Sequence, residues 1–161
     1  MINFGDKERN LSNEDISFWE KKLGFSFQNS YKTFIKEYNG SYVSNNYIEI
    51  PPGQGACLSK ILSLEEVFEY MKSINDKVVD NNYFPFALDD SGNFFLMGKH
   101  SDTVYFYDHE YTGMSAITEI AKNLDGFLTI IQPVSLDNVL MPKGKIIYMN
   151  EDILNKFRKK P

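Results

Sequence analysis

The chain has 161 residues, of which 42% are hydrophobic, and its formal net charge at pH 7 is −5. This length suits one domain with a sizeable core, and the composition excludes a disordered chain. The single cysteine, Cys57, excludes an internal disulfide framework and a four-cysteine zinc site. The sequence contains neither a signal-peptide pattern nor an apolar run approaching the roughly 20 residues that span a bilayer. These features predict a single cytoplasmic domain over residues 1–161 that does not enter a membrane.

Acidic residues are concentrated in the middle of the chain. Residues 63–110 carry ten acidic side chains against three lysines, whereas residues 143–161 carry a net charge of +4. An acidic middle argues against direct binding of nucleic acid, which requires clustered lysine and arginine. It is compatible with a basic protein partner, because opposite potentials speed association and disfavour wrong pairings. A solvated acidic surface that aids solubility explains the same charges without a partner.

Two amphipathic helices are predicted in the first forty residues. The first begins after Ser12, a good N-cap that is followed by acidic residues, and ends at Gly24. The second begins near Ser30 and ends at Asn39-Gly40, since glycine readily takes the left-handed conformation found at helix ends. Each helix has one apolar face at helical spacing. The residues of these faces are Ile16, Trp19 and Leu23 in the first helix and Tyr31, Phe34, Ile35 and Tyr38 in the second.

A short strand and a third helix are predicted next. Residues 47–50 are predicted as a strand and residues 51–55 as a loop, because consecutive prolines cannot continue a β-ladder. The two glycines of this loop do not form a phosphate-binding motif, since no Lys-Ser or Lys-Thr pair follows them. The capping box Ser63-Leu64-Glu65-Glu66 predicts a helix from Ser63 to about Ile74.

The stretch from Pro85 to Met97 predicts a β-hairpin at the centre of the fold. Two nearly continuous apolar runs flank the turn Asp89-Asp90-Ser91-Gly92-Asn93, in which Gly92 is free to take a positive φ. Because both runs are apolar throughout, we expect both faces of these strands to be covered. Residues 103–107 predict a further strand, and the short turn before it makes that strand an antiparallel neighbour of the hairpin.

The last part of the chain predicts two helices and a strand. Seven apolar residues keep helical spacing between about Ser115 and Ile131, which predicts the longest helix of the chain there. Residues 145–149 are predicted as a strand and residues 151–157 as a short amphipathic helix. Helices before, between and after a meander of strands indicate an α+β domain, in which helices flank an antiparallel or mixed sheet.

Each candidate catalytic group has a structural explanation. Asp108-His109-Glu110 places an imidazole between two carboxylates, but no zinc-type spacing of histidines and acids accompanies it. Cys57 would need a histidine base and an oxyanion hole, and nothing near His100 or His109 marks either as that base. Asp89-Asp90 could be a carboxylate pair, yet these residues are also well suited to a turn. The sequence therefore predicts no catalytic residue, no metal site and no cofactor.

Three blocks of the sequence resemble the SUKH superfamily, which joins fungal cell-wall-assembly regulators to bacterial toxin-immunity proteins. Residues 23–40 are similar to the family's segment of a short apolar stretch, an aromatic helix start and a terminal Asn-Gly. The hairpin with its Asp-x-x-Gly-Asn turn is similar to the second block. Residues 104–110, followed by the apolar stretch around Phe127, are similar to the third.

The resemblance covers about residues 12–131 and leaves residues 132–161 as a C-terminal extension. One position departs from the family pattern, because Gln28 stands where the family usually has proline before the helix. Proline favours helix entry, so this departure affects the start of one helix and leaves the expected SUKH-like fold unchanged.

The resemblance implies a protein-binding domain that is not an enzyme. Many bacterial relatives are immunity proteins, which bind and neutralise a cognate polymorphic toxin, often a nuclease. For this chain it implies a cytoplasmic bacterial immunity protein whose acidic segment suits the basic cleft of a nuclease. The acids that we expect to be exposed and to form the partner-binding surface are Glu65, Glu69, Asp89, Asp90 and Asp102.

Two alternatives remain open from the sequence. One is a regulatory interaction module of the same fold, which would bind a partner in signalling or cell-wall assembly, as the fungal relatives do. The other is an enzyme that uses Asp108, His109 and the Asp89-Asp90 turn together with a divalent metal. A toxin gene next to this gene would favour the immunity protein, and metal analysis together with a His109→Ala variant would test the enzyme.

Overall fold

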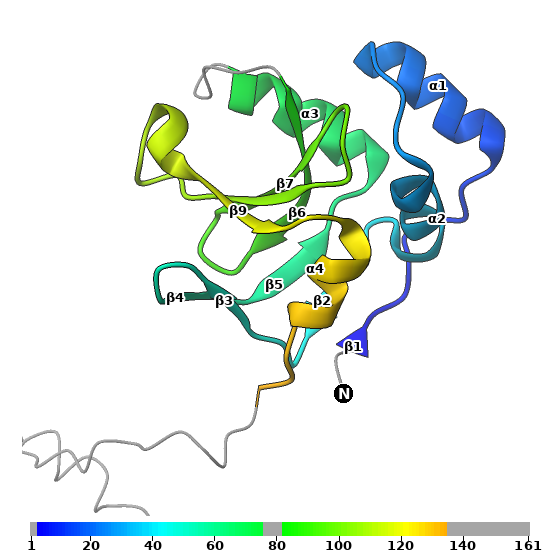
Figure 1. Ribbon diagram of the computed structural model, residues 1–161. Helices are drawn as coiled ribbons and strands as arrows, with labels where there is room; N and C mark the ends of the chain where they lie inside the picture. The colour runs from blue at the N-terminus through cyan, green and yellow to red at the C-terminus, as the bar shows by residue number, and fades with distance from the viewer. Residues whose placement is uncertain (1–2, 76–81, 135–161) are drawn as a thin grey trace, which may run out of the picture.

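A computed structural model describes residues 3–75 and 82–134 (Figure 1). This part of the chain is an α+β domain, which confirms the predicted fold class. Its centre is an antiparallel five-stranded sheet with the strand order β5-β6-β7-β8-β9. The strands of this sheet are β5 (Leu58–Ile61), β6 (Tyr83–Asp89), β7 (Phe94–Gly98), β8 (Val104–Tyr107) and β9 (Ile117–Ala121).

The predicted hairpin is confirmed as β6 and β7, which pair in the middle of this sheet. Both faces of the hairpin are covered, as expected. On one face, Phe95 and Phe106 belong to the main hydrophobic core. On the other face, Leu96 and Tyr107 form a smaller buried cluster with Ile74 and Ala116. The strands at the centre of the sheet are therefore nearly continuous in apolar residues because neither face meets solvent.

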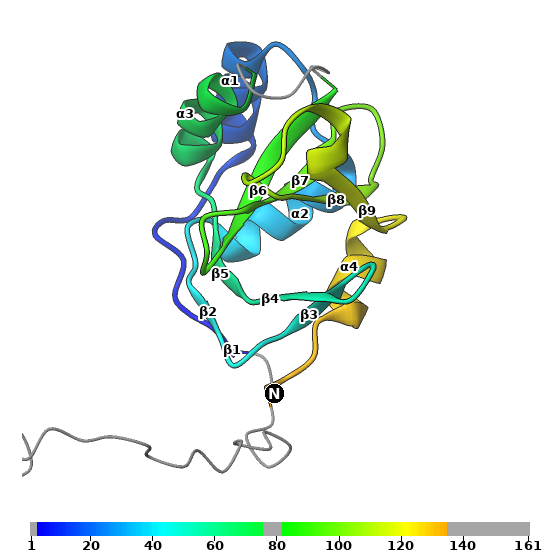
Figure 2. The ribbon, with the colours of Figure 1, turned by 90° about the vertical axis from the view of Figure 1, so that its left-hand side faces the viewer.

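The three predicted helices of the N-terminal half are confirmed as α1 (Asn13–Leu23), α2 (Asn29–Tyr38) and α3 (Leu64–Asn75). Ser12 and Asp15 form a reciprocal capping box at the start of α1, and Gly24 ends this helix at φ +80°. Gln28 provides no side-chain cap for α2. Figures 1 and 2 show α1 and α3 lying next to each other at one side of the sheet.

The rings of α2 fix this helix against the hairpin. Tyr31 is fully buried, and its ring centre lies 5.0 Å from that of Phe84 in an edge-to-face arrangement. Phe34 makes a similar contact with Phe86, with ring centres 6.3 Å apart. Phe127 packs on the same hairpin from a helix near the C-terminal end of the described chain, with its ring centre 5.5 Å from that of Phe86. Aromatic pairs of this kind add to the stabilisation from burial alone.

The long helix predicted between Ser115 and Ile131 is wrong. This stretch contains a 3₁₀ turn, η1 (Gly113–Ala116), then β9, then a short helix, α4 (Leu124–Ile130). The side chain of Asn123 accepts a hydrogen bond of 2.7 Å from the backbone N–H of Gly126, which starts α4 there. The free edge of β8 pairs with residues 117–121, and pairing with the sheet overrides the helical spacing of the apolar residues.

The strand predicted over residues 47–50 is confirmed as β3 (Ile48–Ile50), whereas β1 (Asn3–Phe4), β2 (Val43–Ser44) and β4 (Gln54–Ala56) were not predicted. The strands β1 and β2 pair with each other, as do β3 and β4. The predicted loop over 51–55 is therefore too long, because Gln54 and Gly55 already belong to β4. In Figures 1 and 2 this second hairpin lies beside α4. The strand and helix predicted over 145–149 and 151–157 lie outside the described residues.

No helix within residues 3–75 and 82–134 has the length and apolar character needed to cross a bilayer.

Candidate functional site

Three segments that are distant in the sequence meet at one end of the sheet. The segments are 54–57 before β5, 89–93 between β6 and β7, and 108–116 after β8. Side chains and backbone groups join them. Gln54 Nε2 donates to Asp108 Oδ2 at 3.2 Å, and the backbone N–H of Asp90 donates to the carbonyl of Cys57 at 3.2 Å.

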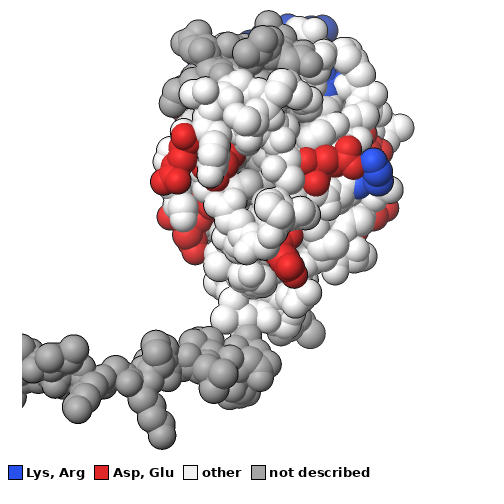
Figure 3. Space-filling model, turned by 60° about the vertical axis from the view of Figure 1, so that its left-hand side comes forward, with Lys and Arg blue, Asp and Glu red and all other residues white. Residues whose placement is uncertain are grey.

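The acids of these segments are Asp89, Asp90, Asp108 and Glu110, and the segments contain no lysine or arginine. We call this part of the molecule, residues 54–57, 89–93 and 108–116, the acidic end. It lies toward the left of Figure 1, where β4 and the η1 turn are seen. Figure 3 turns this side forward and shows acidic side chains in several places, with basic ones beside one of them and at the upper edge. The surface therefore presents mainly negative charge on this side.

Asp89 shapes the turn of the hairpin and is not a surface acid. Its side chain accepts hydrogen bonds from the backbone N–H groups of Ser91 and Asn93, at 2.9 and 2.7 Å, and from Asn93 Nδ2, at 3.0 Å. Asp89 is only 7% exposed, so the expectation that it is exposed is wrong. The reason is that a turn needs an acceptor for its free N–H groups, and a buried carboxylate supplies it. The interpretation of Asp89 as a turn residue is confirmed.

The side chains of Asp108, His109 and Glu110 do not converge on one point. His109 Nδ1 lies 2.6 Å from Asn93 Oδ1, and since an amide oxygen only accepts, Nδ1 carries the proton. Asp108 Oδ1 accepts from the backbone N–H of Glu110 at 3.0 Å. Across residues 3–75 and 82–134, no three His, Cys, Asp or Glu side chains are grouped so that they could hold a metal ion. The polar groups of this sequence connect the loop to its neighbours.

Cys57 lies half-buried at the acidic end. Burial raises the pKa of its thiol, and the charges of Asp90 and Asp89 raise this pKa further. A raised pKa lowers the fraction of thiolate at neutral pH, and the thiolate is the nucleophilic form. The environment of Cys57 is therefore the opposite of one that activates a nucleophile.

The structure does not bring the five predicted acids together. Asp102 lies in the turn between β7 and β8, at the other end of the sheet from Asp90, and β7 alone has five residues, or about 17 Å. Its side chain accepts a hydrogen bond of 2.7 Å from Ser30 Oγ. Glu65 and Glu69 lie on α3, where Glu65 pairs with Arg9 Nη2 at 2.8 Å. Of the five, only Asp89 and Asp90 lie at the acidic end.

Sequence reasoning did not identify Met114, and it weighed Tyr111 only as an exposed ring that could stack on a nucleic-acid base, which the surrounding negative charge disfavours. Tyr111 and Met114 are 56% and 58% exposed and lie three positions apart in the loop that follows β8. The sequence gives Asp108 and Glu110 as candidate catalytic groups and as part of the third family block, and neither is among the predicted partner-binding acids. The absence of lysine and arginine from residues 100–121 was the available signal for an acidic surface there.

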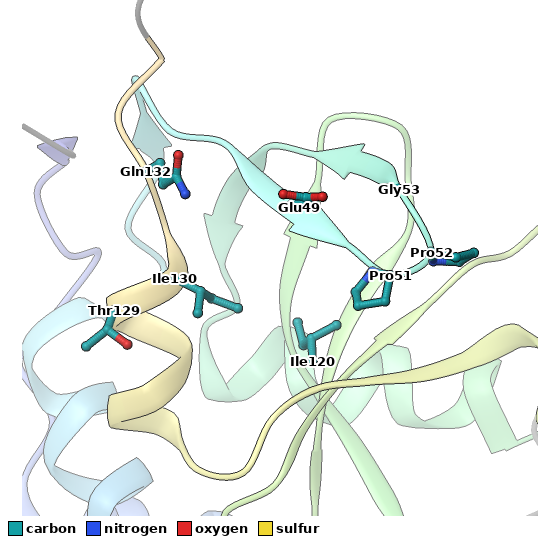
Figure 4. Close-up of a pocket in the computed structure, with 8 residues that line it drawn as sticks. All are labelled: Glu49, Pro51, Pro52, Gly53, Ile120, Thr129, Ile130 and Gln132. Atoms are coloured by element: carbon teal, nitrogen blue, oxygen red, sulfur yellow. The ribbon is translucent and has the colours of Figure 1, made fainter.

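An open pocket of about 540 Å³ lies on another side of the β3–β4 hairpin. Figure 4 shows Pro51, Ile120 and Ile130 around it, with Glu49 above. Glu49 is the one ionisable side chain among the eight residues that line it. Acid–base or nucleophilic catalysis requires at least two cooperating groups in reach of each other, and this lining supplies one. The lining residues are Glu49, Pro51, Pro52, Gly53, Ile120, Thr129, Ile130 and Gln132.

The sequence model of the SMI1 / KNR4 family (SUKH-1) matches residues 10–130. This range covers more than half of the chain and runs from the start of α1 to the end of α4, so it includes the central hairpin and the acidic end. A search of curated proteins found no significant match.

Proposed function

The chain belongs to the SMI1 / KNR4 family (SUKH-1), and we propose that it is an immunity protein, which binds a cognate bacterial toxin in the cytoplasm and blocks it. The family membership supports a role through protein–protein interaction and without catalysis by this chain. The proposed toxin has a basic surface, such as the substrate cleft of a nuclease. No cofactor, metal ion or direct contact with nucleic acid is part of this proposal.

The observation that carries the proposal is the negative charge of the described surface. The acidic end exposes Asp90 and Glu110 and contains neither lysine nor arginine. Glu65, Glu69 and Asp102 add further acids on α3 and at the opposite end of the sheet. A nuclease cleft is basic because it binds phosphates, and a protein that presents carboxylates competes with the polyanionic substrate for this cleft.

An inhibitor of this kind acts by occupying the cleft. Complementary charge raises the association rate and disfavours partners of the wrong sign. A stable interface of ordinary size buries about 1,600 Å² in total, which exceeds the area of any single turn. Glu65, Glu69, Asp90 and Asp102 remain the candidate partner-binding acids, whereas the proposed role of Asp89 is to hold the turn that presents Asp90.

Co-expression tests the proposal. The chain is produced together with the toxin domain encoded next to its gene, and we expect growth to be restored and a complex to be recovered. Lysine substitutions at Glu65, Glu69, Asp90 and Asp102 are then compared one by one, and those in the interface slow association most at low salt. A chain that leaves the toxicity of every neighbouring toxin domain unchanged would contradict the proposal.

The same family membership supports a second candidate. A regulatory module of this fold would bind a partner in signalling or cell-wall assembly. The gene neighbourhood distinguishes the two candidates, because a toxin or secretion cassette is expected only for an immunity protein. Affinity purification of the chain from its own cell, followed by mass spectrometry, gives the same distinction at the level of the protein partner.

A further inference from the structure

We propose that the partner docks on the acidic end, where Tyr111 and Met114 act as apolar anchors and Asp90 and Glu110 form a charged rim. The occupant is a protein with a basic surface around an apolar recess. This inference rests on the proposed function and adds to it the place of binding and the chemistry of the partner surface.

The two anchors are large apolar side chains that the fold leaves in solvent. More than half of the surface of Tyr111 and of Met114 is exposed, although Tyr107 at the end of β8 and Ala116 at the end of the loop are buried. Tyrosine and methionine are enriched in the cores of protein interfaces, where aromatic anchors supply much of the binding energy. Methionine also adapts its shape to an irregular recess.

The loop that carries the anchors is held in place at its base. The backbone N–H of Asp108 donates to the carbonyl of Ala116 at 2.8 Å, which closes the loop. The backbone N–H of Tyr111 donates to the carbonyl of Asp108 at 3.2 Å, and Ser115 Oγ donates to the carbonyl of Thr112 at 2.7 Å. A loop that is already ordered loses less conformational entropy on binding, so its exposed side chains can contribute more to affinity.

The charges around the anchors specify the partner. Asp90 and Glu110 are exposed, and the contact between His109 and Asn93 places the loop of Glu110 beside the turn of Asp90. The backbone N–H of Asp90 is bonded to the carbonyl of Cys57, which fixes that turn as well. No lysine or arginine in these segments offsets the carboxylates. A surface of one sign around an apolar centre favours a basic rim on the partner.

Phe18 on α1 provides a contrast. It is 59% exposed, but Lys22 Nζ lies 5.9 Å from the centre of its ring, and Lys21 is another basic neighbour on the same helix. The exposed Glu14 lies one helical turn before Phe18. Phe18 is therefore about as exposed as Tyr111, but both acidic and basic side chains surround it. In Figure 1 it lies on the opposite side of the molecule from the η1 turn.

The test measures the affinity of the full chain for the inactivated toxin domain encoded next to its gene, by isothermal titration calorimetry. We expect Tyr111→Ala and Met114→Ala each to weaken binding at least about tenfold, as anchors do. Tyr111→Phe keeps the ring and is expected to stay within about threefold of the wild type. Glu110→Lys and Asp90→Lys are expected to slow association at low salt and to have little effect at high salt.

Phe18→Ala and Glu14→Lys are the matched controls on α1 and are expected to leave affinity and association rate unchanged. Thermal unfolding confirms that each variant is folded. Binding of the toxin by the Tyr111→Ala/Met114→Ala double variant with wild-type affinity overturns the docking place and leaves the proposed function intact. Absence of binding by the wild-type chain overturns the proposed function, and the docking place with it.

Discussion

Asn93 Oδ1 and His109 Nδ1 lie 2.6 Å apart, and this contact joins the turn of the central hairpin to the loop that follows β8. Asn93 Oδ1 also accepts the backbone N–H of His109 at 3.0 Å, and Asn93 Nδ2 donates to Asp89. One buried amide therefore bridges two turns that are 16 positions apart in the sequence. The part of the molecule that exposes Tyr111 depends on this bridge for its position.

Replacing Asn93 by alanine is expected to destabilise the fold by about 1–3 kcal/mol, because it leaves buried donors and acceptors without partners. The free energy of unfolding from urea denaturation measures the loss. Ser91→Ala is the matched control in the same turn, since only the backbone N–H of Ser91 takes part in the network, and it is expected to change stability by less than about 0.5 kcal/mol. An unchanged stability for Asn93→Ala would show that the bridge is dispensable.

Gly92 holds a backbone conformation that other residues resist. Its φ is +88°, and no atom lies within 4 Å of the position that a Cβ would take, so any cost comes from the backbone alone. We expect Gly92→Ala to destabilise the fold by about 1–2 kcal/mol and Gly92→Asn by less, because asparagine tolerates the left-handed region. Thermal or urea unfolding of the two variants shows which of them loses more stability. Equal stability of the alanine and asparagine variants would contradict this explanation.

Cys57 is expected to react slowly with iodoacetamide. Burial and the charges of Asp90 and Asp89 raise its pKa, so the rise in alkylation rate occurs at higher pH than for an unfolded thiol. For the same reason its deprotonation opposes folding as the pH rises above the ordinary thiol pKa. Asp90→Asn removes one negative charge and should move the rate profile toward lower pH. Asp102→Asn, at the other end of the sheet, should leave the pH profile of the alkylation rate unchanged. Equal shifts of this profile for both variants would exclude a local charge effect.

The capping box of α1 predicts a loss of stability at low pH. The backbone N–H of Ser12, then its hydroxyl, and then Arg9 lower the pKa of Asp15. A lowered pKa means that the stabilisation is present at neutral pH and is lost as the pH falls from the ordinary carboxyl pKa through the lower one. Ser12→Ala should cost about 1 kcal/mol at pH 7, as loss of an N-cap does. Asp15→Asn should reduce the loss of unfolding free energy between neutral and acidic pH. A pH dependence equal to that of the wild type would show that Asp15 is not the cause.

Most of the local structure was predicted because its causes are local. Ser12 and Ser63 with their capping acids start α1 and α3, and the turn with Gly92 and Asn93 closes the central hairpin. Each of these features depends on atoms within a few positions of one another. The similarity to SUKH proteins also rests on such blocks, and the family match over residues 10–130 confirms it.

The stretch from Ser115 to Ile131 was beyond prediction from local pattern. Its apolar spacing fits a helix, yet residues 117–121 pair with β8. A free strand edge offers backbone hydrogen bonds that no local propensity accounts for. The short strands β1, β2, β4 and β5 escaped prediction for the same reason, since each is defined by its partner strand.

The sequence by itself determined the helix caps, the central hairpin, the α+β class and the acidic balance of the chain. Only the tertiary structure decided which acids share a surface. It buries Asp89 within its own turn, places Asp102 at the opposite end of the sheet, and brings the loop of Glu110 beside the turn of Asp90. The physical reason is that burial and distance in space depend on strand order and register, which arise from contacts between residues far apart in the chain.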